Sequence, residues 1–183
     1  KVSISNLPRQ DMFTSDDVGK YKFNILKKKI SKINKKVKVK TYRVKAEDKN
    51  LGKILKQYDV IVDGTDNFKA KFLLNKFSLK YKKKLIIGAI SKFEGHIFTF
   101  DFNLKNSPCL KCFYQGEPAE GVLDCETDGI LGSTAVITGS LQANEVLKTI
   151  LNVGKNLNSQ ILIVDLLNLK FRKVLFKKRK GCI

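Results

Sequence analysis

Four cysteines stand out as residues whose type and spacing fit metal chemistry. Cys109 and Cys112 form a CxxC pair in "SPCLKC", and Cys182 follows a glycine in "KKRKGCI". Thiolates at this spacing are common ligands of a tetrahedral zinc ion, which needs four ligands. Redox proteins share the CxxC spacing, so an unmetallated pair is the alternative. The fourth cysteine, Cys125, stands alone in a segment rich in turn residues, where chemistry by itself assigns it no role.

Two carboxylates follow the apolar run in "DVIVDGTDN". Asp63 and Asp66 come directly after a stretch that is typical of a parallel strand buried on both faces. Parallel sheets bind ligands at the carboxyl ends of their strands, and a carboxylate there can hold Mg²⁺ against nucleotide phosphates. Asp-Gly-Thr-Asp is also a common turn and cap sequence, so a structural role is the alternative for both residues.

The elements that position these residues are predicted from hydrophobic periodicity. Strands are expected at 1–5, 37–44, 59–63 and 84–90, and helices at 16–33, 50–58 and 68–81. This alternation favours an α/β fold with a doubly wound, Rossmann-like, mostly parallel sheet. The following segments predict an antiparallel extension, with a strand at 94–102, a loop at 107–129, a long helix at 129–151 and a hairpin at 160–176.

The composition is that of a globular chain with a large positive charge. The 183 residues are 43% hydrophobic and carry a formal net charge of +19. Nearly all of this excess is lysine on the wet faces of amphipathic segments, whereas arginine is the side chain that best reads phosphates and base edges. We therefore expect no nucleic-acid partner, and a zinc-stabilised nucleic-acid-binding module is kept as an alternative. No apolar run of membrane-spanning length and no signal peptide is found, which predicts a cytoplasmic protein without a membrane partner.

Several motifs together give the chain a resemblance to a known family. In order, they are "SISNLPRQ", "VGKYK", "VIVDGTDNF", "EGHIFTF", "PCLKC", "DCETDGILG" and "TGSLQANEVLKTI". Over essentially the whole chain they resemble the ThiF/MoeB/HesA family, bacterial relatives of the ubiquitin-activating enzymes. The resemblance implies a homodimeric adenylyltransferase that uses ATP and Mg²⁺. Its substrate would be the C-terminal glycine of a small ubiquitin-like sulfur carrier protein, in thiamin, molybdopterin or related sulfur-transfer biosynthesis.

The resemblance also implies roles for individual residues. The expected cofactor-binding residues are Ser5, Asn6, Arg9, Lys22, Asp66 and Asn67. Arg9 and Lys22 would bind phosphates, and Asp66 would be the magnesium ligand. The candidate catalytic residues are Asp66, Arg9 and Cys125. Adenylation places negative charge on the α-phosphate and on pyrophosphate, so cations and a metal-holding carboxylate suit this chemistry. In some relatives the position of Cys125 forms a covalent link to the carrier or to sulfur, and in others it is dispensable, so its role stays open.

The chain departs from the family pattern at both ends. The glycine-rich nucleotide loop with which family members begin is absent, and Lys1 falls within what resembles their second strand. We therefore expect residues 1–183 to be a single adenylation domain that is truncated at both ends. A nucleotide-binding oxidoreductase on the same fold is the alternative enzyme, although no constellation for hydride transfer is found.

The C-terminal departure concerns the cysteines. The chain ends at "GCI", where the family reads Gly-Cys-x-x-Cys. The resemblance therefore implies Zn²⁺ held by Cys109, Cys112 and Cys182, with a fourth ligand two residues beyond Ile183.

Overall fold

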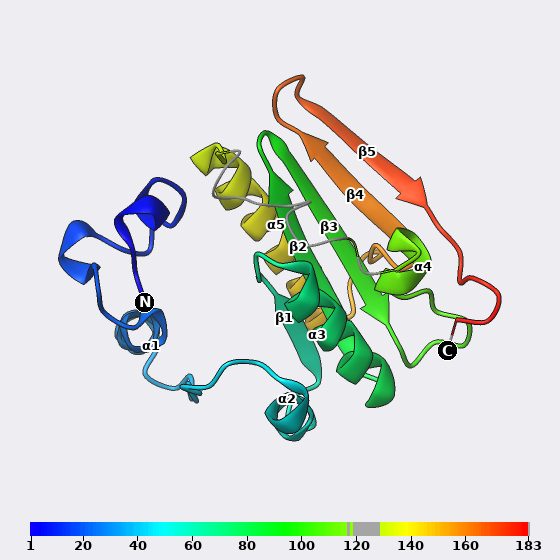
Figure 1. Cartoon of the computed structure of the whole chain (residues 1–183), viewed down its shortest axis with the longest axis horizontal. Helices are drawn as coiled ribbons and strands as arrows, with labels where there is room; N and C mark the ends of the chain where they lie inside the picture. The colour runs from blue at the N-terminus through cyan, green and yellow to red at the C-terminus, as the bar shows by residue number, and fades with distance from the viewer. Residues whose placement is uncertain (117, 119–128, 183) are drawn as a thin grey trace.

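A five-stranded mixed sheet forms the centre of the computed structural model, which describes residues 1–116, 118 and 129–182. The strands lie side by side in the order of the sequence (Figure 1). They are β1 (Val60–Asp63), β2 (Lys84–Ser91), β3 (Glu94–Asp101), β4 (Gln160–Asp165) and β5 (Lys170–Leu175). Only β1 and β2 pair in parallel, and the pairs from β2 to β5 are antiparallel.

Helices cover both faces of this sheet, as expected for a doubly wound arrangement (Figure 1). The 3₁₀-helices are η1 (Ile4–Arg9) and η2 (Ser15–Asp17), and the α-helices are α1 (Lys22–Ile33), α2 (Asp48–Leu55), α3 (Phe68–Lys80), α4 (Leu110–Tyr114) and α5 (Gly132–Leu151). α3 packs with α2 and α4 on one face, and α5 packs on β2 and β3 from the other. Within the described part of the chain, no helix is both long and apolar enough to cross a membrane.

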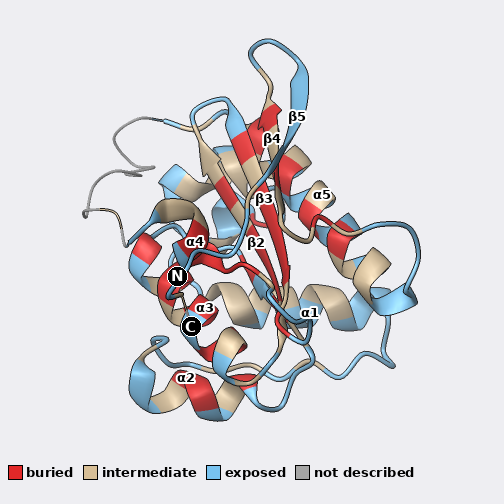
Figure 2. Ribbon diagram, turned by 90° about the vertical axis from the view of Figure 1, so that its right-hand side faces the viewer, coloured by how far each residue is buried: buried red, intermediate tan, exposed pale blue. Residues whose placement is uncertain are grey.

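The core lies on both faces of β2 and β3, which are the most buried strands (Figure 2). Successive side chains of a strand point to opposite faces. Leu85 and Ile87 accordingly join the cluster beneath α3, and Ile86 joins the cluster beneath α5. The prediction of a second buried strand at 84–90 is thus confirmed. β1 differs, because Val62 is 52% exposed, so the prediction that this strand is buried on both faces was wrong.

The prediction of a mostly parallel sheet was also wrong, because two of the four expected parallel strands do not form in the described structure. Residues 1–5 are held locally, since the N–H of Val2 donates to the carbonyl of Lys20 and the N–H of Gly19 donates to the carbonyl of Val2. Residues 37–44 alternate in sequence but are exposed or half-buried and pair with no strand. Alternating apolar and polar residues give a segment one apolar face. A strand also needs a neighbouring strand that pairs with its backbone N–H and C=O groups.

The other elements match the sequence closely, with two local differences. The expected helix at 16–33 is split, because Gly19 adopts a φ of +83° between η2 and α1. The expected loop at 107–129 contains the short helix α4. The long helix, the antiparallel strand at 94–101 and the edge hairpin of β4 and β5 are confirmed.

Candidate functional site

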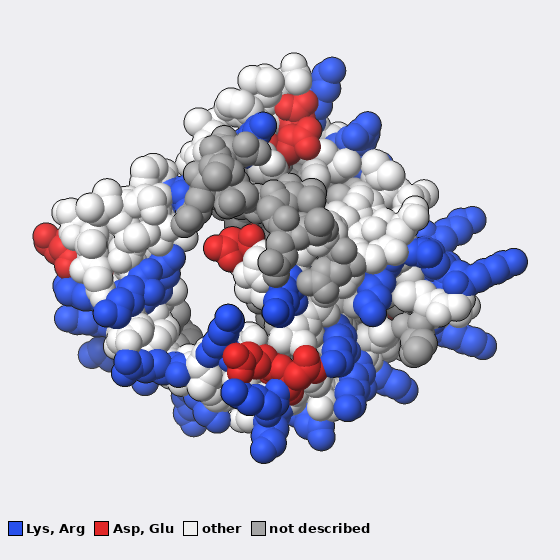
Figure 3. All heavy atoms as spheres, in the orientation of Figure 1, with Lys and Arg blue, Asp and Glu red and all other residues white. Residues whose placement is uncertain are grey.

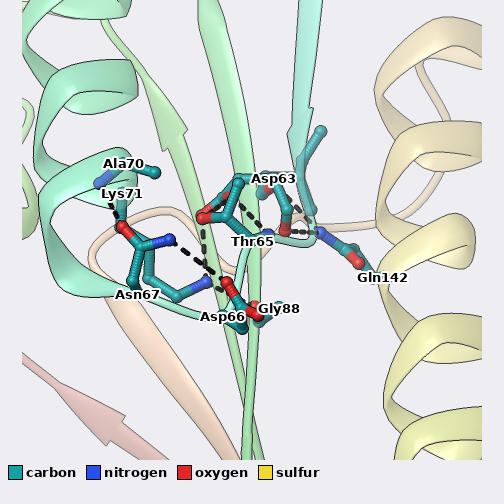
Figure 4. A network of polar contacts seen from close by, with 9 residues as sticks. Asp63, Thr65, Asp66, Asn67, Ala70, Lys71, Gly88 and Gln142 are labelled. Atoms are coloured by element: carbon teal, nitrogen blue, oxygen red, sulfur yellow. Dashed lines mark hydrogen bonds and ion pairs between the residues drawn. The ribbon is translucent and has the colours of Figure 1, made fainter. Parts of the chain in front are cut away.

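The loop that follows β1 holds the two aspartates in different environments (Figure 4). Asp63 is 1% exposed. One of its carboxylate oxygens accepts from the N–H and the hydroxyl of Thr65 at 2.8 and 2.7 Å, and the other pairs with the ammonium of Lys71 at 3.1 Å. Its main-chain carbonyl accepts from the side-chain amide of Gln142 at 2.7 Å. With both oxygens engaged below the surface, Asp63 organises the loop and does not face a ligand.

Asp66 is exposed, at the carboxyl end of β1. The alternative that Asp66 caps α3 was wrong, because the N-cap is Asn67, whose side-chain oxygen accepts from the N–H of Ala70 at 2.9 Å. The side-chain amide of Asn67 donates to Asp66 at 3.1 Å and so restrains its carboxylate. The cap therefore leaves the carboxylate of Asp66 available for a ligand.

Lys22, in the N-terminal part of the chain, lies within the electrostatic influence of both Asp66 and Arg9. Lys22 is the first residue of α1, and Arg9 is the last residue of η1. Burial lowers the pKa of Lys22, the negative charge of Asp66 opposes that shift, and the positive charge of Arg9 adds to it. The charges of Arg9 and Asp66 thus each lie close enough to Lys22 to act on it. Two cations and one carboxylate can bind a phosphate chain together with a divalent metal.

The remaining residues predicted for nucleotide binding lie on η1 beside Arg9. The guanidinium of Arg9 donates to the carbonyl of Ser5 at 2.8 Å, the hydroxyl of Ser5 pairs with that of Ser3 at 3.0 Å, and the N–H of Asn6 donates to the carbonyl of Ser3. An open hollow separates this N-terminal part from the sheet, with acidic and basic side chains at its rim (Figure 3). Ser5, Asn6 and Arg9 thus lie together on η1, and the charges of Arg9 and Asp66 both act on Lys22.

Helix α5 positions this region through contacts that the sequence did not reveal. Gly132, its first residue, lies so close to η1 that an added Cβ would be 2.3 Å from the carbonyl oxygen of Pro8. Farther along α5, the side-chain amide of Gln142 donates to the carbonyls of Asp63 and Ile86 and thereby ties α5 to the last residue of β1 and to the interior of β2. Small residues at the start of the helix were the only sequence signal of this close packing.

The cysteine cluster is a second candidate site. The sulfur of Cys109 lies 3.9 Å from that of Cys112 and 3.5 Å from that of Cys182. All three sulfurs are within 4.8 Å of one another. Tetrahedral zinc with bonds of about 2.3 Å places its sulfurs about 3.8 Å apart, so this donor set fits the ion. Burial and the two neighbouring thiols raise the pKa of Cys182 to about 12. Cys125 lies outside the described residues.

Comparisons with known proteins show the family to which the chain belongs. The model of the ThiF family matches residues 1–183. The chain belongs to the ThiF family. It is 34% identical to a sulfur carrier protein adenylyltransferase of Thermus thermophilus, over 100% of this chain and 69% of that protein. It is also 36% identical to a probable molybdopterin-synthase adenylyltransferase of Gracilaria tenuistipitata var. liui, over 94% of this chain and 48% of that protein.

The solved structures support the fold. A crystal structure of E. coli MccB with ATP matches with a TM-score of 0.80 at 18% identity, over 100% of this chain and 55% of that one. At this identity the match shows the fold alone. The ThiF-family chain thus spans between 48% and 69% of the length of these three proteins. The family resemblance predicted from the motifs is confirmed.

Proposed function

We propose that this ThiF-family chain is part of an ATP-dependent adenylyltransferase whose substrate is the C-terminal glycine of a small ubiquitin-like sulfur carrier protein. The observation that carries the proposal is the exposed carboxylate of Asp66, which does not cap α3 and whose charge, like that of Arg9, acts on Lys22. The names of the two relatives, a sulfur carrier protein adenylyltransferase and a probable molybdopterin-synthase adenylyltransferase, support the choice of substrate class.

The proposed reaction requires little acid–base catalysis from the protein. The carrier's terminal carboxylate attacks the α-phosphorus of ATP, a carboxyl oxygen–phosphorus bond forms, and the bond from the α-phosphorus to the bridging oxygen breaks to release pyrophosphate. The attacking carboxylate is already ionised, so no general base is needed. Negative charge grows on the phosphate oxygens, and Lys22 and Arg9 would stabilise it.

Asp66 would hold Mg²⁺ in this arrangement, because a hard cation prefers oxygen ligands such as carboxylates. The ion would supply Lewis acidity to the phosphate oxygens when bound. Asn67 keeps the carboxylate of Asp66 oriented by donating to it at 3.1 Å. Ser5 and Asn6 on η1 would contact the nucleotide beside Arg9. In a later step the thiolate of Cys125 would attack the carrier's acyl adenylate, form a thioester and displace AMP.

Zinc would have a structural role. Cys109 directly precedes α4, Cys112 lies within it, and Cys182 comes from the C-terminal segment, so a shared ion would tie these two parts of the chain together. Three thiolates and a fourth ligand outside the described residues would leave no open coordination position for catalysis. The N–H of Arg179 donates to the sulfur of Cys112 at 3.5 Å and would support a thiolate there.

A homodimer is the assembly that we propose for the enzyme. Helix α5 exposes four large apolar side chains, three of them in its last turns, which are Val136, Leu147, Ile150 and Leu151. Exposed apolar patches on a soluble surface often mark contacts with another chain. The resemblance to a homodimeric family favours a second copy of this chain as the partner.

A pair of matched substitutions tests the role of Asp66. In the full-length protein, Asp66→Asn should reduce carrier-dependent ATP–pyrophosphate exchange by roughly 100- to 1000-fold, the scale of one strong electrostatic contact with a transition state. The melting temperature should stay close to that of the wild type, because Asn67 supplies the cap. Asp63→Asn is the control and should lower the melting temperature, because it breaks the buried pair with Lys71. Near-normal exchange by Asp66→Asn would remove Asp66 from the catalytic machinery.

A further inference from the structure

A buried ion pair lies directly beneath the loop that carries Asp66. The side chain of Lys71 is 3% exposed and that of Asp63 is 0% exposed. Lysine is rarely buried this completely, because removing an ammonium from water costs several kcal/mol unless a partner compensates. Lys71 is also at the start of α3, where the helix dipole disfavours a cation.

Stability alone gives little reason for such a pair. Well-packed apolar side chains of similar size often replace a buried ion pair without loss of stability, whereas removal of one partner is strongly destabilising. A buried pair can instead select one conformation out of several. The geometry around Lys71 shows which conformation is selected.

The ammonium of Lys71 joins three elements at one point (Figure 4). It donates to the carboxylate of Asp63 at 3.1 Å and to the carbonyl of Gly88 at 2.9 Å. Its own backbone belongs to α3, Asp63 ends β1, and Gly88 belongs to β2. The second oxygen of the same Asp63 carboxylate holds both the N–H and the hydroxyl of Thr65. Lys71 therefore sets the orientation of a carboxylate that in turn holds the residue before Asp66.

Asp66 thus lies between two restrained neighbours. Thr65 is anchored inward to Asp63, and Asn67 is anchored to the first turn of α3 as its N-cap. We propose that Lys71 is a positioning residue that holds the loop in the conformation presenting Asp66 to Lys22 and Arg9. The predicted effect on metal use depends on the adenylyltransferase function proposed above, whereas the predicted effect on the loop does not.

Replacement of Lys71 separates these effects. Lys71→Met keeps most of the side-chain volume and leaves the Asp63 carboxylate buried without its cation. The carboxyl must then take up a proton or be hydrated, and either change weakens its hold on Thr65. Lys71→Arg keeps the charge and the donors and should rescue the loop. Lys76→Met is the matched control, because Lys76 is on the same helix and pairs with Asp48 at the surface, where both side chains are more than half exposed.

The first readout is hydrogen exchange of the Thr65 amide, followed by NMR in the full-length protein. Its N–H donates to Asp63 at 2.8 Å, so it should be protected in the wild type, in Lys71→Arg and in Lys76→Met. In Lys71→Met the amide should exchange at least about tenfold faster. If this amide keeps its wild-type protection in Lys71→Met, the inference is overturned, whatever the activity of the protein.

The second readout is the Mg²⁺ concentration that half-saturates carrier-dependent pyrophosphate exchange. Partners that orient a metal ligand typically contribute 10- to 100-fold to metal affinity or activity, so Lys71→Met should raise this concentration by roughly that factor. Lys71→Arg should return it to within about threefold of the wild type. An unchanged Mg²⁺ requirement in a Lys71→Met protein that exchanges pyrophosphate would contradict the positioning role.

A double variant covers the case in which Lys71→Met does not fold. Asp63→Asn with Lys71→Met removes both buried charges and should restore the melting temperature. It still lacks the tether to the Gly88 carbonyl, so the Thr65 amide should stay fast and the Mg²⁺ requirement high. If the double variant regains the wild-type melting temperature, the wild-type protection of the Thr65 amide and the wild-type Mg²⁺ requirement, Lys71 serves stability alone. If the wild type shows no carrier-dependent pyrophosphate exchange, the proposed function fails. Hydrogen exchange of the Thr65 amide still decides the role of Lys71 in that case.

Discussion

Gly132 provides a sensitive test of how the N-terminal segment is placed. An added Cβ would lie 2.3 Å from the carbonyl oxygen of Pro8, and ordinary contact begins at 3.4 Å. Gly132→Ala must therefore push the Pro8–Arg9 backbone and the start of α5 apart by about 1.1 Å, since two atoms cannot share that space. A misplacement of about 1 Å at a site of this kind can reduce the rate by roughly 100-fold. We expect a loss of that order, because Arg9 moves away from Lys22 and Asp66.

Gly139 is the matched control on the same helix. No atom lies within 4 Å of the position where its Cβ would be, and the residue is exposed in the interior of α5. Gly139→Ala should leave carrier-dependent ATP–pyrophosphate exchange unchanged and stabilise the helix by about 0.5–1 kcal/mol. Both variants would be assayed at saturating carrier and ATP, with melting curves in parallel. If Gly132→Ala were as active as Gly139→Ala, the contact between η1 and α5 would not position Arg9.

Two further predictions concern the cysteine cluster and a buried carboxylate. Cys112→Ser should reduce the zinc content of the full-length protein below one ion per chain by elemental analysis and lower its melting temperature, whereas stoichiometric zinc in this variant would rule out the cluster as the metal site. Glu145 is buried, which raises its pKa, but hydrogen bonds from Lys148, the N–H of Leu157 and Thr99 outweigh burial and bring the pKa below its usual value of 4.5. Its stabilisation is therefore present above about pH 4.5 and is lost as the pH falls through the lower folded pKa. The melting temperature of Glu145→Gln should accordingly fall less steeply below pH 5 than that of the wild type, and equal slopes would contradict this assignment.

The parts of the fold that periodicity could predict are those in which pattern and burial coincide. β2 and α3 are long, apolar on the face that packs, and bounded by turn residues, so their positions follow from the sequence. The alternating segment at 37–44 has the same local signal as a strand but finds no ladder partner in the described structure. The hydrophobic pattern of one segment does not show which strand lies beside it. For this reason the sheet has fewer parallel strand pairs than predicted.

The candidate site shows a similar limit. The motif placed Asp66 at the end of a strand, and the structure agrees, but it could not tell which of two adjacent residues caps α3, because Asp and Asn cap about equally well. Lys71 has the same residue type as the exposed Lys69 and Lys76 on its helix. Only the fold shows that it points inward to Asp63, because burial depends on which elements surround the helix.

Carrier-dependent ATP–pyrophosphate exchange by the full-length protein tests the proposed function most directly. Radiolabelled pyrophosphate should enter ATP only when Mg²⁺ and a ubiquitin-like sulfur carrier with an intact C-terminal glycine are both present. Removal of that glycine should abolish the exchange, because its carboxylate is the attacking group. Exchange at the same rate without the carrier, or no exchange with any ubiquitin-like sulfur carrier from the same organism, would contradict an adenylyltransferase of this class.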